Sequence, residues 1–192
     1  MLDSVCEQNK KHVTFDSPFQ AHKRHMGTPV RILGIDPGLR QTGWGMIIAD
    51  GPRISHIAHG VISPDPSLAL ALRLAEIYRG VTALVIEHQP DIAGVEETLV
   101  NAGAQSALKL GQARGAAMTA LAVSLVEVAE FSPRRIKQSV VGTGKADKDQ
   151  ITFMVKRLLP RAGEMKADAA DALACAICTA HHRPAAPVRG VA

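Results

Sequence analysis

Three short apolar segments follow one another early in this sequence, before any helical pattern begins. They are VRILGID, WGMIIA and ISHIAHGVI at residues 30–36, 44–49 and 54–62, separated by turn residues such as PG and DGPR. Runs of this length, bounded by glycine and proline, are typical of β-strands. Consecutive strands with short connections usually pair as antiparallel neighbours. A chain that starts in this way has to build a sheet and cannot be a helical bundle.

The remainder of the sequence alternates helical and strand patterns. It holds helices over 68–85, over 104–123, from Pro133, over 148–159 and from Ala167, and strands at 91–96 and 126–131. Ser132 before Pro133 is a typical helix start, with serine as the N-cap. The order βββαβαβααα predicts an α/β fold in which helices cover one mixed sheet.

The length of 192 residues suits one ordinary domain, which we expect over residues 29–182. Residues 1–28 are polar and show no period, so they are expected to form a disordered extension, and residues 183–192 a flexible tail. The first residues also lack the apolar stretch of a secretory signal.

The amino-acid composition excludes several classes of protein. No apolar run approaches the roughly 18–20 residues of a membrane helix, so no membrane association is expected. Three cysteines give no disulfide framework, which favours a reducing, cytoplasmic location. A net charge of +4 is a weak indication of a polyanionic partner, while an aromatic content of 3% argues against extensive base stacking.

Four carboxylates stand at the ends of predicted elements. Asp36 closes the first strand and Glu96 closes the fourth, and both strands are otherwise apolar. In open α/β sheets, ligand sites lie beyond the carboxyl ends of the strands. Asp168 and Asp171 are three residues apart at the start of the last helix, so both project from one helix face.

Converging carboxylates repel one another and raise each other's pKa unless a cation is present. Hard oxygen ligands select Mg²⁺ or Mn²⁺ rather than zinc, and a pair of such ions suits phosphoryl transfer. Each acid also has a simpler explanation, because a strand-end aspartate is common in turns and acids in a first helical turn complement the helix dipole. Spacing alone leaves both interpretations open.

Five motifs together resemble the RuvC family of Holliday-junction resolvases: ILGIDPGLRQTGWG, GVEETL, SALKLGQARG, RRIKQSVVGTGKADKDQI and KADAADALA. The resemblance implies an RNase H-like fold, with a five-stranded mixed sheet flanked by helices on both faces. It implies a homodimeric crossover junction endodeoxyribonuclease that nicks two strands of a four-way DNA junction symmetrically, leaving 5′-phosphate and 3′-hydroxyl ends. It further implies two Mg²⁺ ions per subunit, with Mn²⁺ as a substitute, and the RuvA–RuvB branch-migration complex as a partner.

Carried over to this sequence, the resemblance assigns the catalytic and metal-binding positions to Asp36, Glu96, Asp168 and Asp171. Glu96 is preferred to Glu97 because it directly follows the apolar strand. The candidate DNA-binding residues are Lys137, Lys148, Lys145, Leu99 and Arg135. Basic side chains at these positions would contact phosphates, and a solvated helix face is the alternative explanation for them.

Leu99 departs from the family pattern. Relatives often carry an aromatic residue at this position, which can reach unstacked bases at the crossover. Leucine offers apolar surface but no ring, and stacking is worth roughly 1–3 kcal/mol per base. We therefore expect a different junction distortion or sequence preference.

Two groups of small or thiol-bearing residues have competing explanations. Gly111 and Gly115 suit close packing within one chain or the dimer contact that the resemblance implies, which the two-fold symmetry of a junction favours. Cys175 and Cys178, followed by two histidines, resemble zinc ligands. Both thiols continue the helical stripe of the two aspartates inward, so we expect them to be buried as small apolar groups.

Three other functions compete. Actin-like ATPases and sugar kinases also place an aspartate at the end of a first strand, but they need two lobes. A different RNase H-like nuclease, such as one that processes ribosomal RNA precursors, could use the same acids, although SALKLGQARG and ADAADALA favour the resolvase. A non-catalytic junction-binding protein would not require all four acids.

Overall fold

The computed structural model describes residues 29–98 and 103–183, and its elements follow the expected order. They are β1 (Val30–Asp36), β2 (Thr42–Asp50), β3 (Arg53–Ile62), α1 (Leu70–His88), β4 (Ile92–Glu96), α2 (Ala104–Val123), β5 (Glu127–Phe131), α3 (Pro133–Val141), α4 (Lys148–Leu158) and α5 (Ala167–His182). The predicted extension and all but the first residue of the predicted tail lie outside the described residues. None of the helices within those ranges is long and apolar enough to cross a membrane.

The five strands form one mixed sheet in the order β3-β2-β1-β4-β5. The first three strands pair antiparallel, as expected from their short connections. Strand β4 runs parallel to β1, and β5 runs parallel to β4. The carboxyl ends of β1, β4 and β5 therefore lie at one edge of the sheet.

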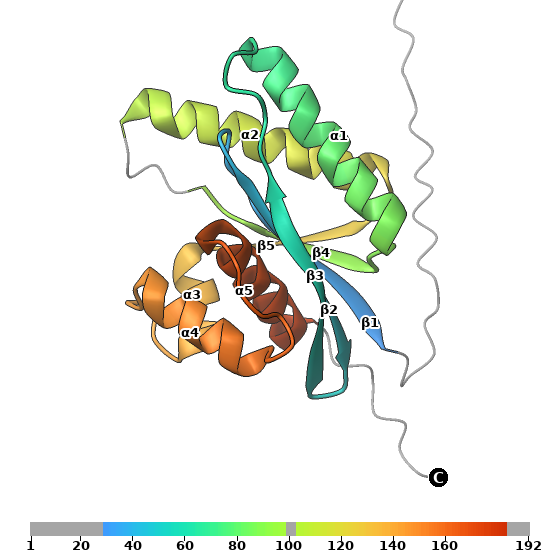
Figure 1. Ribbon diagram of the computed structural model, residues 1–192, viewed down its shortest axis with the longest axis vertical. Helices are drawn as coiled ribbons and strands as arrows, with labels where there is room; N and C mark the ends of the chain where they lie inside the picture. The colour runs from blue at the N-terminus through green and yellow to red at the C-terminus, as the bar shows by residue number, and fades with distance from the viewer. Residues whose placement is uncertain (1–28, 99–102, 184–192) are drawn as a thin grey trace, which may run out of the picture.

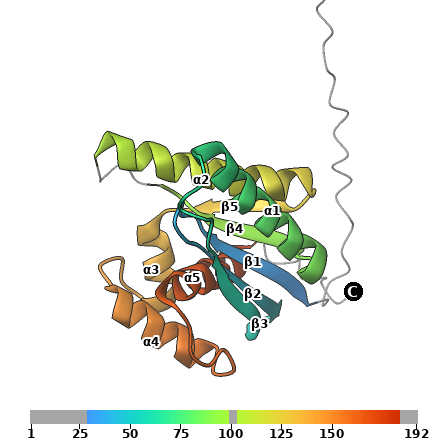
Figure 2. The same cartoon turned by 45° about the horizontal axis from the view of Figure 1, so that its top comes forward.

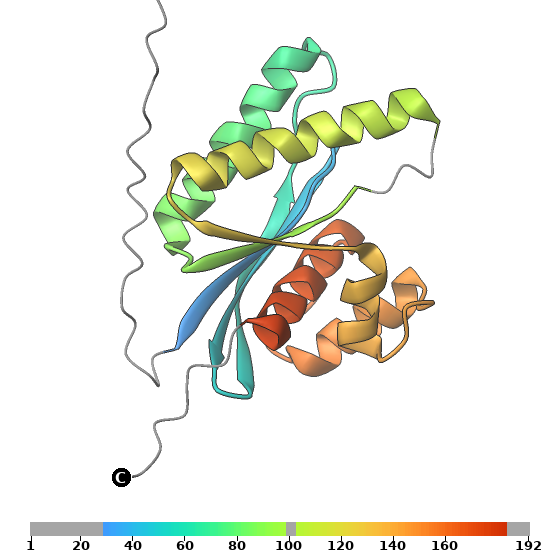
Figure 3. The same cartoon turned by 180° about the vertical axis from the view of Figure 1, so that it is seen from behind.

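Helices cover both faces of this sheet (Figures 1 and 3), which confirms the expected architecture. Helices α1 and α2 cross one face, and α5 lies on the other with α3 and α4 packed against it (Figure 2). Along β1, Ile32 belongs to the core under α5 and Leu33 to the core under α1 and α2. Successive side chains of a strand point to opposite faces, so a strand covered on both sides is apolar throughout.

Helix α5 lies almost directly on the backbone of β1, β2 and β4. A Cβ atom added at Gly34 would overlap the carbonyl oxygen of Ala172 and lie 2.6 Å from the backbone nitrogen of Ala176. An added Cβ at Gly43 would similarly meet the backbone of Asp168. The glycines let this alanine-rich helix approach the sheet, and its first turn consequently reaches the edge where β1 ends.

The starts of α3 and α4 differ from each other. Ser132 is the N-cap residue of α3 and Pro133 its first residue, as expected, although the serine side chain makes no capping hydrogen bond. Its backbone carbonyl instead accepts hydrogen bonds from the amides of Arg135 and Ile136. Helix α4 begins with a capping box between Asp147 and Gln150, with nitrogen–oxygen distances of 2.8 and 3.1 Å. This cap places Lys148 at the first position of α4.

Candidate active site

The four acids of the sequence analysis meet at one edge of the sheet. Ile35 of β1 and Val95 of β4 are paired in parallel, so the residues that follow them, Asp36 and Glu96, leave the sheet side by side. The first turns of α5 bring Asp168 and Asp171 to the same place, where both carboxylates act electrostatically on Asp36.

Burial and mutual repulsion change the acidity of this cluster. Burial, followed by the charges of Glu96, Asp171 and Asp168, raises the pKa of Asp36 to about 8. Burial and the charge of Asp171 raise the pKa of Glu96 to about 7. Carboxyl groups that hold protons near neutral pH for these reasons would release them to a divalent cation, so the cluster has the chemistry of a hard-metal site.

Lys148 faces the same cluster from α4. Its Nζ lies 3.3 Å from Oδ2 of Asp171, and its side chain is 72% exposed. Burial raises the pKa of Asp171, and the charge of Lys148 partly offsets this rise. Within the described residues, no three acidic, histidine or cysteine side chains converge as tightly as the ligands of a single ion. The donor set fits a divalent cation, provided that the carboxylates draw together around it.

The raised pKa of Asp36 makes the stability of the metal-free protein depend on pH. The carboxyl titrates at 3.8 in the unfolded chain and at about 8 in the folded protein. Between these values only the folded state keeps the proton, so the free energy of unfolding falls as pH rises through that window. We expect Asp36→Asn, which cannot ionise, to raise the Tm in EDTA at pH 8 by at least about 2 °C, the shift that roughly 1 kcal/mol produces in a domain of this size. The difference should disappear at pH 4, and equal Tm values at pH 8 would contradict it.

The basic candidates divide into two groups. Lys137 and Lys148 lie close enough to the acids to oppose the rise that burial causes in the pKa of Glu96. Arg135 points elsewhere, with its guanidinium 5.9 Å from the centre of the Phe131 ring. Lys145 is exposed in the connection between α3 and α4, and Leu99 lies outside the described residues.

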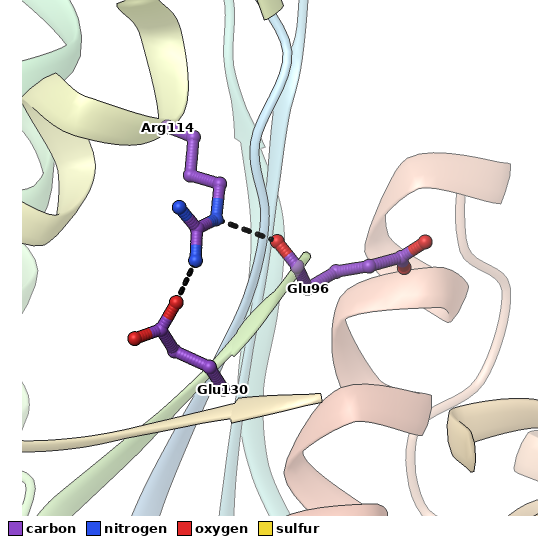
Figure 4. Close-up of polar contacts among 3 residues, drawn as sticks. All are labelled: Glu96, Arg114 and Glu130. Carbon is purple, nitrogen blue, oxygen red and sulfur yellow. Dashed lines mark hydrogen bonds and ion pairs between the residues drawn. The ribbon is translucent and has the colours of Figure 1, made fainter. Parts of the chain in front are cut away.

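Arg114 of α2 is a residue whose role the sequence analysis did not identify. Its Nε donates a 3.2 Å hydrogen bond to the carbonyl oxygen of Glu96, and its guanidinium pairs with the carboxylate of Glu130 (Figure 4). The side chain of Glu96 extends away from Arg114, toward the opposite side of the sheet (Figure 4). Arg114 therefore anchors the end of β4 from the α2 side of the sheet and fixes the backbone of Glu96. No sequence pattern distinguishes it from a surface cation.

The thiols of α5 are buried, as predicted. Burial raises the pKa of Cys178 to about 11, so this thiol stays protonated and apolar at neutral pH. His182 Nδ1 lies 2.9 Å from the carbonyl oxygen of Cys178, and His181 contacts Ser139 instead.

Comparison with known proteins identifies the family of this chain. The model of the family described as crossover junction endodeoxyribonuclease RuvC matches residues 32–179. The chain belongs to the RuvC family. RuvC of Hyphomonas neptunium is 68% identical over 167 residues, covering 87% of this chain and all of that protein. RuvC of Caulobacter vibrioides is 56% identical, covering 82% of this chain and 93% of its own.

Solved structures agree with this assignment. The structure of T. thermophilus RuvC in complex with a Holliday junction substrate aligns with a TM-score of 0.73 and 28% identity, covering 79% of this chain and 93% of that one. The yeast mitochondrial Holliday junction resolvase Ydc2 shares the fold, with a TM-score of 0.60 and 13% identity over 81% of this chain and 80% of its own. The RNase H-like fold expected from the RuvC resemblance is confirmed.

Proposed function

We propose that this RuvC protein is a structure-specific endonuclease that resolves four-way DNA junctions by hydrolysing phosphodiester bonds. The observation that carries the proposal is the acidic cluster, Asp36, Glu96, Asp168 and Asp171, at the open edge of an RNase H-like sheet. The structure of T. thermophilus RuvC with a Holliday junction substrate supports DNA as the substrate of this family member. The Hyphomonas and Caulobacter relatives are crossover junction endodeoxyribonucleases, which leaves the alternative of ribosomal RNA precursor processing without support.

The four carboxylates would hold Mg²⁺, with Mn²⁺ as a substitute, and we propose two ions per subunit. Such ions supply Lewis-acid activation of water and neutralise charge on the phosphate that is attacked. The chain's own contribution is to keep hard oxygen donors partly buried and close together, so that the charges of Glu96, Asp171 and Asp168 add to the effect of burial in raising the pKa of Asp36. Hydrolysis would leave 5′-phosphate and 3′-hydroxyl ends.

Lys148 and Lys137 would bind the phosphate that is cut. The Lys148 side chain is exposed, and its ammonium group pairs with Asp171, which places it beside the cluster where the phosphate would be held. A cation preorganised beside the reacting phosphate stabilises negative charge that develops in the transition state. Lys145, Arg135 and Leu99 are proposed to contact the DNA farther from that phosphate, with RuvA–RuvB as a cytoplasmic partner complex.

We infer that α2 forms the contact of a homodimer. Gly111 and Gly115 are exposed, and a Cβ atom added at either would meet no atom of the described residues within 4 Å. Leu108 lies three residues before Gly111 on the same helix face and is 64% exposed. An open strip of small residues beside an exposed leucine suits the close approach of a second copy, and two-fold symmetry matches the two equivalent strands of a junction.

A supercoiled plasmid that extrudes a cruciform tests nuclease activity and dimerisation together. We expect wild-type protein with Mg²⁺ to convert the circle directly to a linear product, because a dimer cuts both strands within one complex. A plasmid that lacks the inverted repeat should stay intact, as should the cruciform plasmid in EDTA. Equal cutting of both plasmids would refute structure selectivity, and accumulation of nicked circle as the final product would refute the dimer.

A further inference from the structure

A second concave surface lies on the other side of the β1–β2 loop from the acids. A cavity of about 860 Å³ opens between this loop and the first turns of α1 and α2. Leu39, which lines it, packs with the core under α1 and α2, whereas Asp36 faces α5. The volume falls within the roughly 300–1,000 Å³ of typical small-ligand pockets.

The charged residues that line this cavity are all cationic: Arg40, Arg73 and Lys109. Arg73 is fixed in place, since its Nη2 donates a 2.8 Å hydrogen bond to the carbonyl oxygen of Leu39. Its Nε is buried and has no hydrogen-bond partner among the described residues. Arg73 also faces Asp65, an exposed acid outside the lining. The cavity therefore offers one anchored and two exposed cations to an anion.

The helices that border the cavity add to this positive potential. Neither α1 nor α2 has an acidic residue in its first turn or a side-chain hydrogen bond at its N-cap. The free amide groups of these first turns carry partial positive charge. Both helix N-termini border the same cation-lined cavity, so their partial charges add to those of the three cations.

The rest of the lining combines apolar residues with two polar ones, Gln105 and Ser106. Leu39, Leu70 and Leu110 lie beside the three cations, and Leu70 is 37% exposed although it lines a concave surface. A ligand that matches such a wall combines a negative group with a flat apolar one. A nucleotide has both parts, because its phosphate suits the cations and the face of its base suits leucine side chains.

We propose that this cavity binds one unstacked nucleotide of the junction strand that passes the active site, an inference that rests on the proposed function. Arg40, in the cavity lining, follows Asp36 by only four residues, so the cavity lies within reach of a strand held at the acids. Lys109 also projects from a different side of α2 than Gly111 of the proposed dimer contact. Lys109 and Gly111 are two residues apart on α2, which places them roughly 200° apart around the helix axis.

The test compares junction binding by three variants in EDTA, where cutting cannot interfere. Arg40→Ala and Lys109→Ala should each weaken binding of a labelled four-way junction about tenfold, the loss of one charge-assisted contact. Each should also reduce the slope of log affinity against log salt by about one. Arg53→Ala removes an exposed arginine at the opposite end of the sheet and should leave both quantities unchanged.

Binding of linear duplex DNA and of free nucleotides distinguishes an unstacked-nucleotide site from general phosphate binding and from a site for free nucleotides. A duplex offers no unstacked nucleotide, so its affinity should change less than twofold in Arg40→Ala and Lys109→Ala. Equal losses on junction and duplex, or no loss on either, would overturn the proposal. The proposal would also be overturned if calorimetry showed that dTMP or dAMP binds with micromolar affinity through Arg40 while junction affinity does not depend on Arg40. A wild-type protein that ignores junctions altogether would refute the proposed function instead.

Discussion

Asp171→Asn is expected to lower the rate of junction nicking by at least about 100-fold, the scale on which removing one charge-stabilising group acts in enzymes. The substitution keeps the size of the side chain but removes a negative charge from the cluster that would hold the metal. Single-turnover cutting of a labelled junction in Mg²⁺ measures the effect. Retention of the wild-type rate would refute the assignment of Asp171.

The loss should not come from unfolding or from weak binding. Burial raises the pKa of Asp171, so its charge is unfavourable to the folded protein, and the variant should unfold at a Tm no lower than that of the wild type in EDTA. Junction affinity in EDTA should stay within about threefold, because Lys148 and Lys137 remain. Asp50→Asn is a matched control, since Asp50 is an exposed strand-end aspartate at the opposite end of the sheet.

Gly34→Ala should reduce the free energy of unfolding by about 3 kcal/mol, the upper end of the usual cost of overpacking a core. The added Cβ would overlap the carbonyl oxygen of Ala172 and lie 2.9 Å from the Cβ of Ala176, so helix α5 has to move away from β1. Urea denaturation with an unchanged m-value measures this loss. Because Asp168 and Asp171 begin the same helix, the folded fraction should also nick junctions more slowly.

Gly80→Ala provides the control for this prediction. The same added Cβ, on α1, has its three nearest atoms in the side chain of Ile62, 2.8 Å from Cδ1 and 3.1 Å from Cγ1 and Cγ2, so a side chain and not a backbone atom has to shift. Alanine is also favoured over glycine within a helix by about 1 kcal/mol. We expect its free energy of unfolding to stay within about 1 kcal/mol of the wild type. Equal losses in the two variants would contradict the close packing of α5 on β1.

The order of elements could be predicted from the sequence because periodicity and turn residues are local signals. The strand of residues 30–36 and the helix of residues 104–123 were predicted with the bounds that the structure has. The N-cap of α3 was predicted correctly, but the absence of a hydrogen bond to the Ser132 hydroxyl could not be predicted. Capping geometry depends on side-chain orientation, which composition and spacing do not specify.

The anchoring of Glu96 could not be predicted. Arg114 lies eighteen residues later in a helix of small residues, and its contact with the Glu96 carbonyl exists only because α2 folds back across the sheet. The cation-lined cavity has the same origin, because Arg40, Arg73 and Lys109 come from three separate segments.

The sequence by itself determined the types of element, the four acids at their ends and, through its motifs, the family. Each of these is written in neighbouring residues and needs no knowledge of how distant segments pack. Only the tertiary structure decided that glycines let α5 lie on β1 and β2, which brings Asp168 and Asp171 to the end of β1. The raised pKa of Asp36 follows from that approach, because burial and electrostatic repulsion depend on distances that no spacing along the chain records.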